Sequence, residues 1–246
     1  MTGAQGGLGR EFVGQALARG ARTVYATARS PREWDDPRIV SLRLDVTDDA
    51  SVAAAARAAD DVTIVVNNAG VGGTQSLLSS SVPEVEGVFA TNVFGALRVA
   101  KAFAPVLGRN GGGALVDVLS VLSWLAIAGG YSASKAALWS MTSSLRLELA
   151  RQGTQVVGAH LGYTDTPLIA GLDVEKNDPA DVVAAIWDAV EAGEREVLAD
   201  AVSRQVRAAL SGPLEALYPQ LGALAADRQC RRRDDGPRPA SPAPRW

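Results

Sequence analysis

The fold class is decided by the run Val62-Thr63-Ile64-Val65-Val66-Asn67-Asn68-Ala69-Gly70. Its first five residues are apolar or β-branched without polar alternation, which is typical of a strand covered on both faces. The small and polar residues that follow lie at the carboxyl end of that strand. Ligands of open α/β sheets bind at such ends. The run therefore predicts a buried parallel strand with a ligand site at its carboxyl end.

Similar strands are predicted along the chain, and helical patterns separate them. The strands are Thr23–Thr27, Ile39–Leu44, Ala114–Leu119, Gln155–His160 and Glu196–Ala199. The helices are Arg10–Arg19, Ser51–Ala59, Val82–Leu107, Tyr131–Gln152 and Pro179–Ala192. This alternation predicts an α/β fold with a doubly wound parallel sheet, the three-layer Rossmann fold. The hydrophobic pattern stops after Leu224, and the Arg- and Pro-rich residues 225–246 are predicted to be a disordered tail.

The composition excludes several classes of function. The 246 residues carry a net charge of −3, and an acidic body without a basic stripe argues against a nucleic-acid partner. One cysteine, Cys230, and one histidine, His160, allow neither an internal disulfide framework nor a metal cluster. The chain has no long apolar run and no signal peptide. We therefore expect a cytoplasmic protein with no membrane contact.

The opening residues are rich in glycine and run directly into the first helix. Gly3, Gly7 and Gly9 would let the backbone pass close to a pyrophosphate at the helix N-terminus. A flexible N-terminal tail is the alternative interpretation, since a glycine pattern alone is weak evidence. After the next strand stands Arg29, where proteins that prefer NAD carry an acid. A guanidinium suits a 2′-phosphate, which favours NADP over NAD. The alternative interpretation is that Arg29 is only a solvated surface charge.

A tyrosine and a lysine four residues apart lie in the later helix. Tyr131 and Lys135 share one helix face, and a nearby ammonium favours the phenolate of a tyrosine. The alternative interpretation is that the pair occurs by chance, as it will in any Ala-rich helix. Asn92 is an amide inside an apolar helical stripe, where it carries a propensity cost and needs a structural or catalytic reason. Ser120 closes a buried strand.

Four features occur in order: Thr2-Gly3-x-x-x-Gly7-x-Gly9, Asn67-Asn68-Ala69-Gly70, Ser120 and Tyr131-x-x-x-Lys135. Together they resemble the short-chain dehydrogenase/reductase family, single-domain branch, over roughly residues 2–221. The resemblance implies an oxidoreductase domain over residues 1–224. It also implies that a nicotinamide cofactor supplies the hydride chemistry and the protein supplies orientation and the acid.

The resemblance also assigns roles to residues. Tyr131 would be the general acid/base, and Lys135 would lower its pKa and hydrogen-bond the nicotinamide ribose. Ser120 would hold the substrate oxygen, and Asn92 would anchor a water in the proton relay. Asp45 and Val46 would flank the adenine, and Thr166 would meet the carboxamide. The full set of implied cofactor-binding residues is Gly3, Gln5, Gly7, Leu8, Gly9, Arg29, Asp45, Val46, Asn68, Ala69, Gly70, Tyr131, Lys135 and Thr166.

Two departures from the family pattern concern single positions. Ser120 lies eleven residues before Tyr131, about two fewer than the family spacing, so Ser123 is a second, weaker candidate for its role. Leu161 stands where the family commonly has a proline before the glycine.

The third departure is the start of the chain. The family begins with a buried strand, central in the order 3-2-1-4-5, and here Met1 stands directly before the glycine motif. About four apolar side chains on that strand would contribute roughly 1.5–3 kcal/mol each, against a domain stability of about 5–15 kcal/mol. We expect either a gap in the sheet or closure of its neighbours on each other. The expectation is that the true start lies upstream or that the product is damaged.

Two functions follow as hypotheses. The first is an NADP-dependent oxidoreductase that interconverts an alcohol and a carbonyl on a small, apolar substrate, as a homodimer or homotetramer. The second is a non-catalytic or truncated dinucleotide-binding protein. Thr166–Asn177 is expected to lid the pocket or to form an oligomer contact, and its apolar residues favour an apolar ligand.

Overall fold

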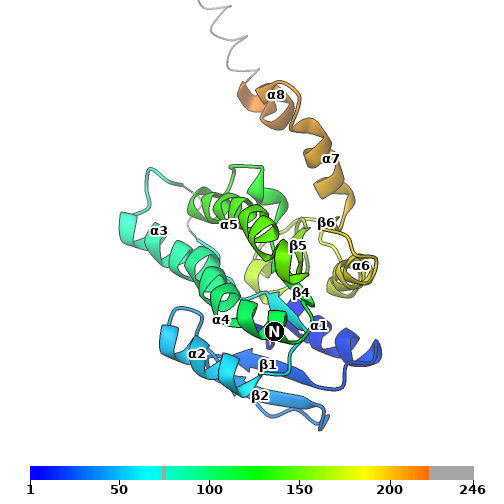
Figure 1. Cartoon of the computed structure of the whole chain (residues 1–246). Helices are drawn as coiled ribbons and strands as arrows, with labels where there is room; N and C mark the ends of the chain where they lie inside the picture. The colour runs from blue at the N-terminus through cyan, green and yellow to red at the C-terminus, as the bar shows by residue number, and fades with distance from the viewer. Residues whose placement is uncertain (74–75, 222–246) are drawn as a thin grey trace, which may run out of the picture.

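The structure is a computed structural model that describes residues 1–73 and 76–221 (Figure 1). The predicted disordered tail, residues 225–246, lies outside the described residues. Within the described residues no helix is long and apolar enough to cross a membrane. Helices α7 (Ala201–Ala209) and α8 (Leu214–Leu217) extend away from the body at one edge of the molecule.

The strands confirm the predicted α/β fold. Those described are β1 (Val24–Ala28), β2 (Ile39–Arg43), β3 (Ile64–Asn67), β4 (Ala114–Val118), β5 (Gln155–His160) and β6 (Glu196–Leu198). Within the described residues every pairing between these strands is parallel, in the orders β1-β2 and β3-β4-β5-β6. All carboxyl ends therefore meet at one edge of the sheet, which is where the predicted site residues lie.

The helices described around the sheet are α1 (Gly7–Ala18), α2 (Asp49–Ala58), α3 (Val82–Phe89), α4 (Ala96–Arg109), α5 (Gly129–Glu148) and α6 (Pro179–Glu191). Their starts follow local capping: the side chains of Asp48 and Asp178 accept amide hydrogens at the starts of α2 and α6. The long helix predicted over Val82–Leu107 is interrupted by a π-helical turn, Ala90–Gly95, which contains Asn92. π turns are frequent at functional sites.

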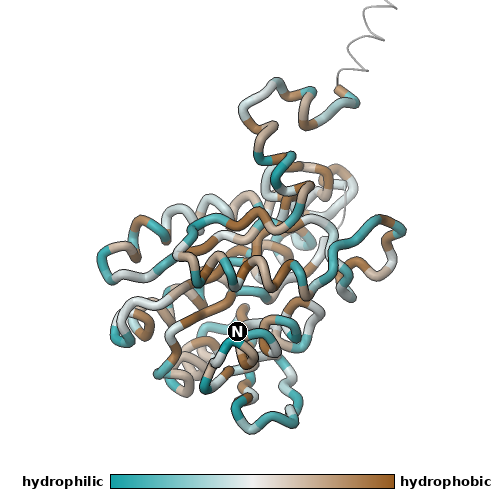
Figure 2. The backbone as a smooth tube through the Cα atoms, turned by 90° about the vertical axis from the view of Figure 1, so that its right-hand side faces the viewer, coloured by the Kyte–Doolittle hydropathy of each residue, from teal (hydrophilic) through white to brown (hydrophobic). Residues whose placement is uncertain are grey.

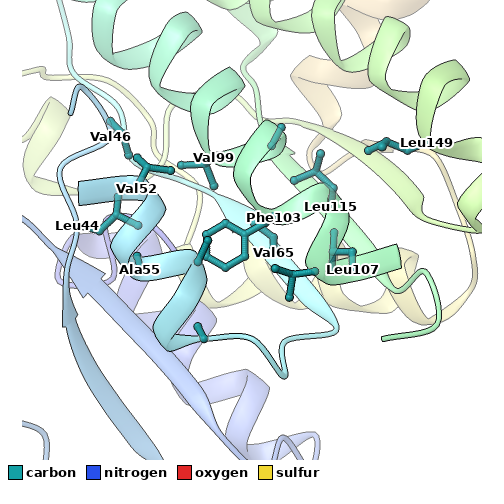
Figure 3. Packing of buried hydrophobic residues seen from close by; sticks show 14 of the residues in the cluster. Leu44, Val46, Val52, Ala55, Val65, Val99, Phe103, Leu107, Leu115 and Leu149 are labelled. Atoms are coloured by element: carbon teal, nitrogen blue, oxygen red, sulfur yellow. The ribbon is translucent and has the colours of Figure 1, made fainter. Parts of the chain in front are cut away.

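Apolar residues fill both faces of the sheet. On the face covered by α2 and α4, Val65, Phe103 and Leu115 pack in one cluster (Figure 3). On the other face, α1 and α6 pack together, and the rings of Phe12 and Trp187 meet edge to face at 5.7 Å. Figure 2 shows the apolar segments gathered in the interior and hydrophilic segments at the outer loops.

No strand pairing joins β1 to β3 within the described residues, so the sheet has a gap. Met1 and Thr2 lie in it: the Met1 amino group donates to Tyr25 O at 3.1 Å, Thr27 N donates to Met1 O at 3.1 Å, and Thr2 N donates to Val66 O at 3.0 Å. These bonds hold the two sheets in register. Of the two expected outcomes, the structure has the gap and not the closure.

Below Met1 the gap is an apolar slot. The cavity in this slot has a volume of about 20 Å³ and is lined among others by Leu42, Val65 and Phe103. Ile64 borders it and is 39% exposed, so the expectation of a strand covered on both faces fails at the start of β3. Burial at the end of the slot lowers the pKa of the Met1 amino group to about 6.

Candidate active site

The glycine loop is fastened to the end of β3. Gly3 has φ +64°, and a Cβ atom there would lie 3.0 Å from Asn68 Nδ2 and 3.1 Å from Ala69 Cα, so only glycine fits without strain. Asn68 Nδ2 donates to the carbonyls of Thr2 (3.0 Å) and Gly3 (3.1 Å). The backbone amides of Asn68 and Ala69 both donate to Thr2 Oγ1 at 3.0 Å. Thr2 is thus a positioning residue that the sequence motif contained but that was not singled out.

The N-terminus of α1 follows directly from this loop. Its N-cap is Gly6, which gives no side-chain cap, and its first turn contains no acid. The amide groups of the first turn are therefore not capped by a side chain and suit an anion. A Cβ atom on Gly9 would lie 2.2 Å from Gly3 O, which keeps the loop and helix in close contact. Leu8, beside Gly9, is half-buried.

Two side chains extend this edge outward. Gln5 Nε2 donates to Ser30 O at 3.1 Å, which ties the loop to the segment after β1. Thr166, after β5, packs against Gly7, because a Cβ atom on that glycine would lie 2.8 Å from Thr166 Cγ2. Gly70 continues the edge from β3 and lies near Asn92, whose Oδ1 would be 3.4 Å from an added Cβ atom.

Basic residues lie at the carboxyl ends of β1 and β2. Arg29 stands exposed after β1, and Arg43 ends β2. Hydrogen bonds from Thr47 N and Oγ1, at 2.9 and 2.7 Å, lower the pKa of Asp45, and the charges of both arginines lower it further. The sequence analysis assigned no role to Arg43. The feature that could have pointed to it is its position, a basic residue at the carboxyl end of a second strand. Val46 is buried against Gly95 of the π turn.

Tyr131 and Ser120 meet at the end of β4. Desolvation raises the pKa of Tyr131 to about 12, and a hydrogen bond with the Ser120 side chain opposes that rise. The Ser120 oxygen also accepts from Leu122 N at 3.1 Å. Ser123, the second candidate, is buried, and its hydroxyl has no partner within the described part of the chain. The structure therefore brings Ser120, and not Ser123, to the phenol.

Lys135 lies beneath this pair and is 6% exposed. Its Nζ atom donates to Val118 O at 2.7 Å and lies 5.7 Å from the centre of the Tyr131 ring, a distance at which a cation is attracted to the ring face. Burial lowers the pKa of Lys135 to about 8, and the charge of Asp117 opposes that fall. The ammonium is thus held by the backbone of β4 next to the phenol.

Asn92 joins the loop after β3 to α5. Its Nδ2 atom donates to Val71 O at 3.0 Å and to Ser134 Oγ at 3.1 Å, while Oδ1 accepts from Val71 N at 2.9 Å. Both ends of the Asn92 side-chain amide are therefore engaged with protein groups. The sequence analysis assigned no role to Ser134, although this residue lies inside the Tyr131–Lys135 motif.

The glycine loop, the uncapped helix start and the polar strand ends together define an α/β dinucleotide-binding protein, and a tyrosine and a lysine lie close together at its sheet edge. The sequence matches the short chain dehydrogenase family over residues 1–177. The chain therefore belongs to the short-chain dehydrogenase/reductase family and is an oxidoreductase of the NAD(P)-dependent kind.

Relatives and solved structures agree with this membership. The chain is 33% identical over 205 residues to an uncharacterized oxidoreductase of Myxococcus xanthus (78% of this chain, 79% of the relative). It is 30% identical over 220 residues to 2-(R)-hydroxypropyl-CoM dehydrogenase of Xanthobacter autotrophicus (82% and 88%). A short chain dehydrogenase from Burkholderia cenocepacia, solved with NADP, superposes with a TM-score of 0.83 at 36% identity, covering 89% of this chain and 95% of that one. A Burkholderia phymatum family member, solved with NAD, gives 0.73 at 25% identity (84% and 90%).

Proposed function

We propose that this chain is an NADP-dependent oxidoreductase that interconverts an alcohol and a carbonyl on a small, apolar substrate, with Tyr131 as acid/base. The observation that carries the proposal is the meeting of the Tyr131 phenol, the Ser120 side chain and the Lys135 ammonium at one sheet edge. These groups come from a helix and a strand end, both rigid elements. They lie at the same edge as the glycine loop.

The residues present fit a dinucleotide. The close approach of Gly3 to Asn68 and of Gly9 to Gly3 leaves no room for side chains, and the first turn of α1 presents amides without a side-chain cap. Asp45 and Val46 would flank the adenine, and Thr166 would meet the carboxamide. Lys135 would hold the nicotinamide ribose. When bound, the nicotinamide donates or accepts the hydride.

The chain's own residues handle the proton. In carbonyl reduction Ser120 would hold the substrate oxygen, and the Tyr131 hydroxyl would give its proton to that oxygen. In alcohol oxidation the phenolate would take the proton back. With a pKa of about 12, Tyr131 alone would be almost entirely a neutral phenol at neutral pH. The Lys135 ammonium beside the ring would favour the anion, because an opposite charge stabilises it. Asn92 would support the relay that returns the proton to solvent.

Preference for NADP over NAD is supported by charge. Arg29 is exposed at the end of β1, with Arg43 at the end of β2, and both act on Asp45. A planar guanidinium matches a 2′-phosphate. The similar Burkholderia cenocepacia protein was solved with NADP.

An apolar substrate is supported by the segment Thr166–Asn177. Its start packs on Gly7, and Leu168 lies across the loop after β3, where a Cβ atom on Gly72 would be 3.6 Å from Leu168 Cδ1. Leu168 and Val174 are 54% and 41% exposed and would line a pocket beside Tyr131. The Xanthobacter relative is named for a hydroxypropyl substrate, in keeping with an alcohol.

We further propose that residues 1–224 form one domain and that the protein is a cytoplasmic homodimer or homotetramer. Exposed apolar side chains on or beside α3 and α5, namely Val82, Phe94 and Leu147, support self-association. Light scattering after size exclusion measures the oligomeric state.

The alternative is a dinucleotide-binding protein without turnover. The apolar slot between β1 and β3 favours it, because a gap in the sheet's centre weakens the scaffold under the site. The two functions are separated by measuring the absorbance of reduced nicotinamide over a panel of alcohols and aldehydes, alongside calorimetric binding of NADPH. Binding with turnover supports the oxidoreductase, and binding without turnover on any substrate supports the alternative.

A further inference from the structure

A buried carboxylate lies in the middle of β4. Asp117 is 0% exposed, and aspartates are almost never fully buried unless paired. Its Oδ1 atom accepts from Asn67 Nδ2 at 2.9 Å, and its Oδ2 atom lies 2.7 Å from Thr142 Oγ1. The Thr142 hydroxyl also lies 2.8 Å from Leu138 O, so one hydrogen serves two acceptors. These hydrogen bonds depend on the protonation state of the Asp117 carboxyl, which can be measured.

Lys135 faces the same strand from α5. Lys135, Leu138 and Thr142 are spaced by three and four residues, so they lie on one face of the helix. Lys135 donates to the carbonyl of Val118, the residue next to Asp117. Within the described residues no carboxylate forms a direct ion pair with Lys135.

The charged groups around this face are few. Asp117 on β4 is the charge that acts on Lys135, against the effect of burial. Desolvation raises the pKa of Asp117 above its ordinary value, and bonds from Asn67 and Thr142 and the charges of Lys135 and Arg146 oppose that rise without cancelling it. Arg146 lies further along α5 and is half-buried, with its guanidinium bonded to Val156 O and Arg195 O. Tyr131 is the titratable neighbour of Lys135 on its own helix.

We propose that Asp117 is a positioning residue for the catalytic pair: its buried carboxylate is the counter-charge that keeps Lys135 an ammonium beside Tyr131. Within the described residues Asp117 makes no hydrogen bond to Tyr131, so its charge acts on the pair through Lys135. Through Asn67 and Thr142 it also ties β3 and α5 to β4. The inference rests on the proposed role of Lys135, and its test below needs no turnover.

The test is a titration of Lys135 by NMR. The chain has three lysines, Lys101, Lys135 and Lys176, so labelling lysine with ¹⁵N at Nζ yields one signal for each. Lys135→Met identifies the buried one. In the wild-type protein without ligand that signal should titrate near the pKa of about 8 expected for Lys135.

Asp117→Asn removes the charge and keeps the hydrogen bonds. The Asn oxygen can still accept from Asn67, and its amide can donate to Thr142 Oγ1, whose hydrogen then goes to Leu138 O. We expect the Lys135 signal to titrate about one pH unit lower in this variant, with Lys101 and Lys176 unchanged. Leu115→Val, a neutral change on the same strand, should lower the melting temperature and leave the Lys135 titration in place.

Unchanged titration of Lys135 in a folded Asp117→Asn variant overturns the proposal. If that variant does not fold, the wild-type protein decides, because the ¹³C shift of the Asp117 carboxyl reports its protonation. An ionised carboxyl at neutral pH supports the counter-charge role, and a protonated one overturns it. Absence of turnover in the unmutated protein, together with the expected Lys135 shift in Asp117→Asn, would instead refute the proposed function and leave this inference standing.

Discussion

The imidazole of His160 stacks on the indole of Trp124, with ring centres 3.8 Å apart and planes 17° from parallel. His160 Nδ1 lies 3.1 Å from the backbone oxygen of Ser120, and Nε2 lies 3.6 Å from Glu196 Oε1. The chain's single histidine is thus buried directly behind the serine of the proposed site. Burial lowers the pKa of His160 to about 4, against the opposing effects of Ser120 and Glu196.

This burial predicts a loss of stability in mild acid. The folded pKa lies below the unfolded value of about 6.5, so the unfolded state binds more protons between the two and stability falls as pH falls through that window. Between about pH 7 and about pH 5 His160 should account for about 2 kcal/mol of lost unfolding free energy.

Denaturant unfolding at several pH values measures this loss. His160→Gln keeps a polar group at the position without a proton to gain, so its stability should fall less over the same range. An equal pH dependence in both proteins would contradict the prediction.

Tyr131→Phe should abolish turnover and keep cofactor binding. The change removes one hydroxyl and little volume, and a general acid contributes about 10²–10⁴-fold in rate. kcat and the Kd for NADPH are to be measured together. Tyr25→Phe is the matched control. The Tyr25 hydroxyl donates to Asp61 Oδ1 at 2.9 Å, and this hydrogen bond lies away from the site. Retention of more than a few per cent of activity in Tyr131→Phe would remove the acid/base role.

Arg29→Ala should weaken NADPH binding far more than NADH binding. Loss of a charge-assisted bond of about 1.5–3 kcal/mol corresponds to about 10–100-fold in Kd. Arg43→Ala tests the second guanidinium, and Arg57→Ala on the exposed side of α2 is the control. Equal affinity of the unmutated protein for the two cofactors would count against the preference.

An apolar segment joined before Met1 should stabilise the fold. About six β-branched residues, extended at about 3.3 Å each, would enter the slot between β1 and β3 and convert the buried Met1 amine into a peptide. Each buried side chain would contribute roughly 1.5–3 kcal/mol. We expect a higher melting temperature and tighter NADPH binding, measured by calorimetry, than for the 246-residue chain.

A polar segment of the same length is the control for this extension. If the apolar and polar extensions melt alike, the slot does not accept a strand. If the 246-residue chain is already monodisperse, melts cooperatively and binds NADPH at micromolar levels, the gap costs less than proposed.

The sequence alone predicted the elements whose causes are local. The helices predicted from Ser51 and Pro179 are present as α2 and α6, and Asp48 and Asp178, directly before them, accept their first amide hydrogens. The unbroken β-branched run ending at Val66 identified a parallel strand, and the order of the motifs identified the family. Each of these depends on residues close together along the chain, where spacing determines geometry.

The tertiary structure decided what distant residues do together. Only packing of α5 on β5 and on the turn Val121–Ser123 after β4 placed Ser120 rather than Ser123 at the phenol. Only pairing of β3 with β4 placed Asn67 beside Asp117, fifty residues away. The sequence allowed two outcomes for the sheet, a gap or closure. The gap prevails because Met1 and Thr2 bond to β1 and β3 together, and contacts between separate segments leave no periodic signal in the sequence.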